Sequence, residues 1–242
     1  MTFESTIPVL NEATTLDKQV RKLHAFLRQH FPKQGQWRIV IADNGSTDAT
    51  PALATALAHE LEEVVSLRLA QKGVGLALKN AWFAAKADIV GYMDLDLATD
   101  LVHFPEAYRA ISEDGFDLVY GTRLHPEALV LNRTQKREIA SRGFNFILKR
   151  YLGVQFSDGM CGFKFLRRSI LDDLYKHGAR NDGWFFATEL LTVGEWLEYR
   201  LYELPVKWTD DPDSSKVRIL PLARKYLKSM YALKKEKRKW KL

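Results

Sequence analysis

Short apolar runs alternate with longer amphipathic segments through the first hundred residues. Short apolar runs bounded by turn residues are typical of buried strands. They occur at residues 5–10, 37–42, 64–69 and 89–93. Helical spacing of apolar residues marks 15–29 and 49–60, and the glycine-containing stretch 71–75 opens a third helix that ends near residue 86. This alternation predicts an α/β fold, with a mostly parallel sheet and helices on both faces.

The pattern beyond residue 100 is less regular, and no repeat or low-complexity linker interrupts it before the tail. We therefore expect one α/β domain at 1–217, followed by a tail at 218–242. Further strands are expected at 117–121, 162–166 and 199–208. Further helices are expected at 103–113, 134–152, 169–176 and 184–196, and from about residue 219 onward.

Acidic side chains follow three of the expected strands, at the point where each strand ends. Glu12 follows the first strand, Asp43 and Asp48 follow the second, and Asp94 and Asp96 follow the strand at 89–93. Ligands of such sheets bind beyond the carboxyl ends of the strands. We therefore expect these carboxylates to gather at one edge of the sheet.

Asp94-Leu95-Asp96 is the most specific of these acidic stretches. Two carboxylates at i and i+2 can both turn toward one hard cation where a strand ends. Mg²⁺ or Mn²⁺ prefers oxygen ligands and commonly bridges carboxylates to substrate phosphates. The alternative is a pair of solvated aspartates in a turn, because two aspartates at this spacing often occur by chance.

The net charge of +6 is unevenly placed. Residues 218–242 hold ten Lys or Arg and one Glu, a net +9, so residues 1–217 sum to −3. This distribution argues against a nucleic-acid-binding domain and for a local anionic partner. A single cysteine, Cys161, excludes an intrachain disulfide and fits a reducing compartment. No apolar run approaches ~18 residues and the first residues lack a signal-peptide pattern, so neither a membrane-spanning helix nor a signal peptide is expected.

The expected last helix is amphipathic and basic. Its lysines and arginines surround an apolar stripe, a composition that fits a helix lying in an anionic headgroup layer. The alternative is a helix packed on the body of the protein, and we favour the membrane for the part after Leu233. Four residues of the helix at 134–152 could enter the membrane beside it: Phe144, Phe146, Ile147 and Leu148. The stripe consists of Ile219, Leu222, Tyr226, Leu227, Met230 and Leu233.

Four motifs occur in the order and spacing of family 2 glycosyltransferases, and the chain resembles that family to about residue 217. The resemblance implies a GT-A (Rossmann-like) fold. The second loop reads Asp-Asn-Gly-Ser where the family usually has a second Asp, and Val74 stands where the family usually has Lys. The motifs are Pro8 to Glu12, Asp43 to Asp48, Gly73 to Asn80, and Asp94 to Asp96.

Motifs in the second half resemble the polyprenyl-phosphate branch of that family. These are Gly121 to Arg123, Arg137-x-x-x-Ser141, Asp158 to Lys164, Glu189 to Leu191, and Glu203 to Trp208 followed by Ser215-Lys216. The branch transfers a sugar from a nucleotide sugar to a lipid phosphate. Details such as Ala98 are closer to the glucosyl type, which uses UDP-glucose. The loop 209–214 is about one residue longer than in that type.

The resemblance implies a donor site and a metal site. Asp94 and Asp96 would hold Mg²⁺ or Mn²⁺ against the donor diphosphate, where a cation stabilises the charge on the leaving group. Asp43 and Glu12 would accept hydrogen bonds from base and ribose. The full set of expected donor-binding residues is Pro8, Asn11, Glu12, Asp43, Asn44, Ser46, Lys79, Asp94 and Lys216.

Arg123, Arg137 and Ser141 would bind the acceptor phosphate, because guanidinium groups suit phosphate oxygens. A phosphomonoester is largely ionised near pH 7, so it needs no general base. Glu189 would then orient the sugar, and Asp96, Arg123, Arg137 and Glu189 form the expected catalytic set. Two alternatives stay open: transfer to a saccharide hydroxyl with Glu189 or a neighbouring acid as base, and a nucleotide-sugar-binding protein without turnover.

The resemblance and the basic tail together predict a peripheral protein on the cytoplasmic, inner face of a membrane. The expected partners are a nucleotide sugar, a polyprenyl phosphate and an anionic membrane surface, with no nucleic acid. A homo-oligomer is left open. The sequence fixes neither the sugar nor the lipid length.

Overall fold

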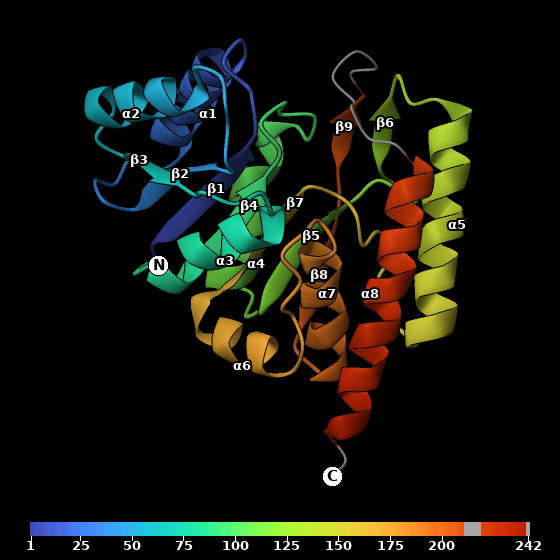
Figure 1. Ribbon diagram of the computed structural model, residues 1–242. Helices are drawn as coiled ribbons and strands as arrows, with labels where there is room; N and C mark the ends of the chain where they lie inside the picture. Colours follow the sequence, from blue (N-terminus) through green and yellow to red (C-terminus); the bar gives the residue numbers. More distant parts are fainter. Residues whose placement is uncertain (211–218, 241–242) are drawn as a thin grey trace.

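A computed structural model describes residues 1–210 and 219–240, and a seven-stranded sheet forms its centre (Figure 1). The strand order is β3-β2-β1-β4-β7-β5-β8. The mostly parallel sheet is confirmed, with one exception: β7 runs antiparallel to both of its neighbours, β4 and β5. The strands are β1 (Phe3–Val9), β2 (Trp37–Asp43), β3 (Val64–Arg68), β4 (Ile89–Met93), β5 (Leu118–Thr122), β7 (Phe163–Arg167) and β8 (Leu201–Pro205).

A second, two-stranded sheet was not expected from the sequence. It pairs β6 (Leu129–Leu131) with β9 (Lys207–Thr209) in parallel. The prediction of a single strand at 199–208 is therefore wrong. The chain pairs with β5 before Val206 and with β6 after it. The N–H of Val206 donates to the Thr122 carbonyl at the end of β5, while its own carbonyl accepts from Leu129 as the pairing with β6 begins.

Helices cover both faces of the main sheet (Figure 1). Their observed bounds agree with the expected ones to within a few residues. A short 3₁₀ turn, η1 (Leu101–His103), precedes α4, and another, η2 (Arg168–Ile170), precedes α6. The α-helices are α1 (Leu16–His30), α2 (Thr50–Glu60), α3 (Val74–Ala84), α4 (Phe104–Ser112), α5 (Gln135–Leu152), α6 (Leu171–Lys176), α7 (Phe186–Trp196) and α8 (Ile219–Lys239).

Two hydrophobic cores lie on opposite faces of the sheet. Strand β4 shows the division, since Ile89 and Met93 belong to one core and Val90 and Tyr92 to the other. Alternate residues of a strand point to opposite faces, so a strand buried on both faces reads as a continuous apolar run. This is why 89–93 is recognisable from the sequence.

Helix α8 packs on the body of the protein and supplies Tyr226, Met230 and Leu233 to the second core. The Tyr226 ring lies 5.3 Å from the rings of Phe144 on α5 and Phe185. Trp240 packs edge-on against His177 and Trp196, with centroids 4.8 and 5.8 Å away.

Of the two alternatives left open for this helix, the structure shows packing on the body at Tyr226, Met230 and Leu233, while Leu227 is 52% exposed. The membrane interpretation of the part after Leu233 stays a prediction. The side chains of Ile219 and Leu222 lie outside the described part of the structure, so the interpretation of these two residues stays a prediction. Among the described residues, no helix is both long and apolar enough to cross a bilayer.

Candidate active site

The loops after β1 and β2 are hydrogen-bonded to each other at the carboxyl edge of the sheet. The backbone N–H of Asn11 donates to Ser46 Oγ (2.9 Å), and that of Glu12 donates to Thr50 Oγ1 (2.8 Å). The N–H of Thr47 returns a bond to Asn11 Oδ1 (2.8 Å). Pro8, within β1, pairs with Ala42 in the register that brings these loops together. The loops that carry Glu12, Asp43 and Asp48 therefore lie together at this edge.

Asp43 presents an unsatisfied oxygen at this edge. Its side chain is fully buried, and Oδ1 accepts from the N–H of Ser46 (2.9 Å). Within the described parts of the chain, Oδ2 has no hydrogen-bond partner, and Nε of the exposed Arg68 lies 3.7 Å away. A buried carboxylate oxygen without a donor is costly. The site is therefore suited to a ligand N–H or hydroxyl.

Asn44 and Lys79 are engaged within the protein. Asn44 is 4% exposed, and its Oδ1 accepts from the N–H of Gly73 (2.5 Å). Lys79 Nζ lies 2.6 Å from both the Arg180 carbonyl and Asp182 Oδ1. Each of these two side chains holds a neighbouring loop in place. Their direct binding to the donor stays a prediction.

Asp94 and Asp96 form a tight turn directly after β4. The N–H of Leu97, whose φ is +53°, donates to the Asp94 carbonyl, and Asp96 Oδ1 accepts from Ala98 (3.0 Å). The Asp94 side chain lies against Gly162, where a Cβ would overlap its carboxylate. Burial, with the neighbouring Asp96, raises the pKa of Asp94 to about 7.

The two aspartates fit a divalent cation in part. Hard cations take carboxylate oxygens together with phosphate oxygens and water, and a cation would relieve the repulsion between Asp94 and Asp96. Within 1–210 and 219–240, no group of three or more His, Cys, Asp or Glu side chains gathers to hold a metal. A cation here would therefore need further ligands from the substrate.

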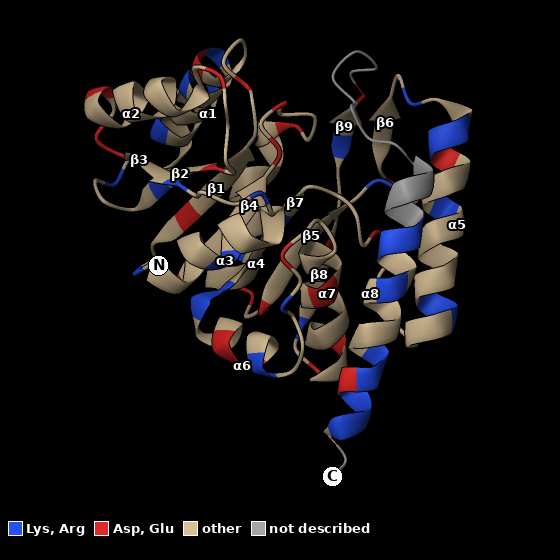
Figure 2. Cartoon of the chain, in the orientation of Figure 1, with Lys and Arg blue, Asp and Glu red and all other residues tan. Residues whose placement is uncertain are grey.

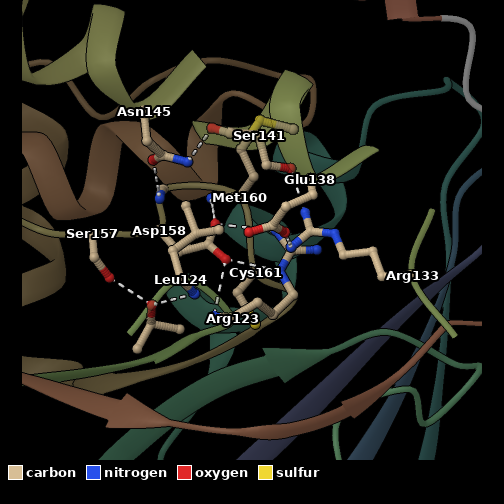
Figure 3. Close-up of polar contacts among 12 residues, drawn as sticks. Arg123, Leu124, Arg133, Glu138, Ser141, Asn145, Ser157, Asp158, Met160 and Cys161 are labelled. Atoms are coloured by element: carbon tan, nitrogen blue, oxygen red, sulfur yellow. Dashed lines mark hydrogen bonds and ion pairs between the residues drawn. The ribbon is translucent and has the colours of Figure 1, made fainter. Parts of the chain in front are cut away.

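Arg123, directly after β5, forms a buried ion pair with Asp158 (Figure 3). Arg123 Nε lies 2.8 Å from Asp158 Oδ2, and Nη2 lies 3.1 Å from Oδ1. Burial raises the pKa of Asp158, but the guanidinium outweighs it and lowers the pKa to about 2. Asn145 holds the same segment, since its Oδ1 accepts from the N–H of Gly159 (2.9 Å).

A second arginine, Arg133, was missed by the sequence analysis. Its Nη2 donates to Ser141, and its Nη1 lies 2.7 Å from Glu138 Oε2 (Figure 3). The guanidinium carbons of Arg123 and Arg133 lie 5.3 and 5.8 Å from the Trp208 ring centroid. Arg133 precedes α5, so helical spacing does not reveal it, and Trp208 is distant in the sequence.

Arg137 and Ser141 lie on α5 beside this pair. Arg137 Nη1 donates to both carboxylate oxygens of Asp210, which is 5% exposed. Three arginines are thus paired internally, with Asp158, Glu138 and Asp210. Guanidinium groups gathered in this way can exchange a carboxylate for a phosphate, which they bind with the same fork geometry. We call Arg123, Arg133, Arg137 and Ser141 the arginine cluster.

Glu189, on α7, is buried and holds the loop before its own helix. Its Oε2 accepts from the backbone N–H groups of Arg180 (2.8 Å) and Asn181 (2.7 Å). Burial raises its pKa to about 7. The expected contact of Glu189 with the sugar stays a prediction. Lys216 lies outside the described residues.

Comparison with known proteins identifies the family. The model for "Glycosyl transferase family 2" matches residues 6–175, and the chain belongs to this family. The search of solved structures finds glucosyl-3-phosphoglycerate synthase from Mycobacterium tuberculosis, in complex with Mn²⁺, UDP and glucosyl-3-phosphoglycerate. It aligns with a TM-score of 0.67 at 18% identity, over 96% of this chain and 79% of that one. This likeness shows the GT-A fold.

Sequence relatives cover most of this chain. Glycosyltransferase AglD of Haloferax volcanii is 31% identical over 209 residues, which are 86% of this chain and 33% of the relative. A dolichyl-phosphate beta-glucosyltransferase of Drosophila melanogaster is 27% identical, over 84% of this chain and 66% of its own length. A protein of the same name from Dictyostelium discoideum is 25% identical, over 94% and 76%. The chain thus spans a third of AglD and about two thirds of the Drosophila enzyme.

Proposed function

We propose that this protein is a metal-dependent, inverting glycosyltransferase that moves a hexose from a nucleotide sugar to a polyprenyl phosphate. One observation carries the proposal. The segment 158–162 contacts both halves of the site: Asp158 pairs with Arg123 of the arginine cluster, and Gly162 lies against Asp94. This segment places a group of guanidiniums beside a pair of carboxylates, as transfer between a diphosphate and a phosphate requires.

The donor occupies the Asp43 side of the site. The unsatisfied Oδ2 of Asp43 accepts a hydrogen bond from the nucleoside, and the linked loops of Asn11, Glu12 and Ser46 surround base and ribose. The diphosphate extends toward Asp94 and Asp96. A divalent cation bound there supplies Lewis-acid stabilisation of the charge on the departing nucleoside diphosphate. Structures of the Mycobacterium tuberculosis synthase in complex with Mn²⁺ or Mg²⁺ and UDP support this assignment.

The acceptor phosphate occupies the arginine cluster. Its ionised oxygen attacks the anomeric carbon in line, the bond from that carbon to the donor's phosphate oxygen breaks, and the nucleoside diphosphate leaves with the electron pair. The configuration inverts, giving a β-linked product. No base is required, because a phosphomonoester is largely ionised near pH 7. Lys216 stays a predicted phosphate-binding residue, outside the described residues.

Glu189 is proposed to orient the sugar through the loop that it holds. Its Oε2 accepts hydrogen bonds from the backbone N–H groups of Arg180 and Asn181. This engagement with the loop supports an orienting role for Glu189, and the arginine cluster is what supports a phosphate acceptor over a saccharide hydroxyl. The names of the Drosophila and Dictyostelium relatives support glucose as the sugar and a polyprenyl phosphate as the acceptor.

A lipid acceptor calls for a membrane-facing surface, and we place it on the outer sides of α5 and α8. Its large apolar side chains are 43–71% exposed. Lys and Arg residues lie along both helices (Figure 2), as binding to anionic headgroups requires. Leu148 is buried and Phe144 packs on Tyr226, so neither is assigned to this surface. The apolar members are Ile139, Phe146, Ile147, Leu227 and Tyr231.

This surface would make the protein peripheral, on the cytoplasmic face of the membrane. The single cysteine agrees with a reducing compartment. A flotation assay tests it: wild-type protein is expected to float with vesicles containing anionic lipid, and Phe146→Ser with Leu227→Ser to float markedly less. Equal flotation of the two proteins would contradict the surface assigned.

A donor and acceptor screen tests the reaction. Radiolabelled UDP-glucose, UDP-N-acetylglucosamine or GDP-mannose is incubated with undecaprenyl phosphate, and the label extracted into organic solvent is counted with Mn²⁺ or with EDTA. Label is expected in the lipid phase, most with UDP-glucose and only with Mn²⁺. Arg137→Ala is expected to lose the activity, while Lys136→Ala, the exposed neighbour on α5, keeps it. No lipid-bound label with any donor would overturn the proposal.

A further inference from the structure

The loop at 180–183, between α6 and α7, contacts three separated parts of the chain. Backbone N–H groups of Arg180 and Asn181 donate to Glu189, as described above. The side chain of Asn181 caps the loop internally, since its Oδ1 accepts from the N–H of Gly183 (2.8 Å). The loop is therefore held in one conformation, and what it contacts on its outer sides is fixed.

One side of the loop packs against the start of α3. A Cβ at Gly73 would lie 2.5 Å from the Asp182 carbonyl oxygen, and a Cβ at Gly75 would lie 2.8 Å from that of Gly183. The N–H of Leu76 donates to the Asp182 carbonyl (3.1 Å). Two glycines are needed in Gly73-Val74-Gly75, which we call the glycine turn, because another backbone approaches it so closely.

The other side of the loop is bound to α8. Asn181 Nδ2 donates to Ser229 Oγ (3.0 Å), and the Arg180 guanidinium lies 3.6 Å from Glu236. Leu233 of α8 also lies against Gly178, just before the loop. Helix α8 thus reaches the glycine turn through a single short loop, although they are about 150 residues apart in the sequence.

The glycine turn is in turn bound to the loop that follows β2. The N–H of Gly73 donates to Asn44 Oδ1 (2.5 Å), and Asn44 adjoins Asp43, whose unsatisfied oxygen is aimed at the nucleoside in the proposed function. A continuous series of contacts therefore runs from Ser229 to Asn181, to the glycine turn, and to Asn44. Each step is a hydrogen bond or a close backbone contact.

We propose that Asn181 and Ser229 are positioning residues for donor binding, and that α8 completes the donor site through the 180–183 loop. This inference rests on the proposed donor site at Asp43. Ser229 touches no substrate. It fixes Asn181, which fixes the loop against the glycine turn, and the glycine turn sets the position of Asn44. Loss of the Ser229 hydroxyl therefore weakens nucleotide-sugar binding while the arginine cluster is unaffected.

Ser229→Ala tests this, with Ser229→Thr as the variant that keeps a hydroxyl and Lys225→Ala as the control one turn earlier on the exposed side of α8. Two measurements are made: hydrogen–deuterium exchange of residues 73–78 without ligand, and the Kd of UDP-glucose with Mn²⁺ by calorimetry. A hydrogen bond such as this partly buried one contributes about 1 kcal/mol, so Ser229→Ala is expected to raise the Kd about three- to tenfold.

Faster exchange at 73–78 is expected in Ser229→Ala alone, with an unchanged KM for undecaprenyl phosphate. Ser229→Thr is expected to behave as wild type in both measurements. Unchanged exchange and Kd in Ser229→Ala would overturn the inference, and so would an equal rise in donor Kd and acceptor KM, which indicates general destabilisation. If wild type binds no UDP-glucose yet Ser229→Ala still exchanges faster, the donor assignment fails while the link from α8 to the glycine turn is supported.

Discussion

Gly162 lies against the side chain of Asp94 so closely that a Cβ at this position would overlap the carboxylate. The same contact is reinforced by the backbone, since the N–H of Asp94 donates to the Gly162 carbonyl (3.2 Å). The end of β4 and the start of β7 therefore share one small space. Only a residue without a side chain leaves room there for the acid proposed to face the donor diphosphate.

Gly162→Ala is expected to displace the Asp94 carboxylate and to lower kcat/KM for sugar transfer about 100-fold, because misplacement by roughly 1 Å has effects of that size. Gly143→Ala is the matched control. It lies in α5 with nothing within 4 Å of its Cβ position, so it is expected to keep activity and to stabilise the helix slightly. Equal activity of the two variants would contradict the role given to Asp94.

Arg133 is expected to bind the acceptor phosphate together with Arg123. Hydrogen bonds to charged groups contribute about 1.5–3 kcal/mol, so Arg133→Ala should raise the KM for polyprenyl phosphate about tenfold or more, with the Kd of UDP-glucose unchanged. Arg142→Ala is the control, because Arg142 also pairs with Glu138 but is exposed. A matching rise in KM for Arg142→Ala would show that Glu138, and not the phosphate, explains the effect.

Glu189 is expected to make stability depend on pH. Burial raises its pKa in the folded protein to about 7, from an ordinary 4.5. The folded state then binds the proton more tightly than the unfolded state does. The stabilisation is complete below pH 4.5 and is lost as the pH rises through 7, with a slope of at most about 1.4 kcal/mol per pH unit.

Denaturant unfolding of wild type and Glu189→Gln between pH 4.5 and 8 checks this. The wild-type free energy of unfolding should fall more steeply with pH than that of the variant, which stays neutral. Parallel curves would show that Glu189 has an ordinary pKa in the folded protein.

Cys161 is expected to be inert in the folded protein. It is fully buried, and burial raises its pKa to about 11, so the reactive thiolate is scarce at neutral pH. Ellman's reagent at pH 8 should detect almost no thiol until denaturant is added, and then one per chain. Rapid titration of one thiol in native protein would contradict the buried position.

Much of the main sheet was predictable because its central strands are buried on both faces. The run at 89–93 stands out in the sequence for this reason. Strand β6 does not stand out, since it has three residues and two of them are exposed. Likewise, an amphipathic helix such as α8 shows that an apolar side must be covered, but its pattern is the same whether protein or lipid covers it.

The candidate site was predictable only where its residues follow strands. Asp43 and Asp94 each end a strand, so the topology alone brings them to the sheet edge. Arg133 was not predictable, because its neighbour Trp208 lies 75 residues further along the chain, and the pairing of β9 with β6 that brings Trp208 close was not expected. The bond of Lys79 to the 180–183 loop was hidden because 103 residues separate Lys79 from Asp182.

The central claim is that a phosphate oxygen of a lipid receives the sugar. The most direct test is phosphorus NMR of undecaprenyl phosphate after incubation in detergent with UDP-glucose, Mn²⁺ and the protein, with Asp96→Asn as control. We expect the lipid phosphomonoester signal to be replaced by a phosphodiester signal in the wild-type sample alone, with release of UDP. A persistent phosphomonoester signal, with UDP released by hydrolysis or by transfer to a hydroxyl, would contradict it.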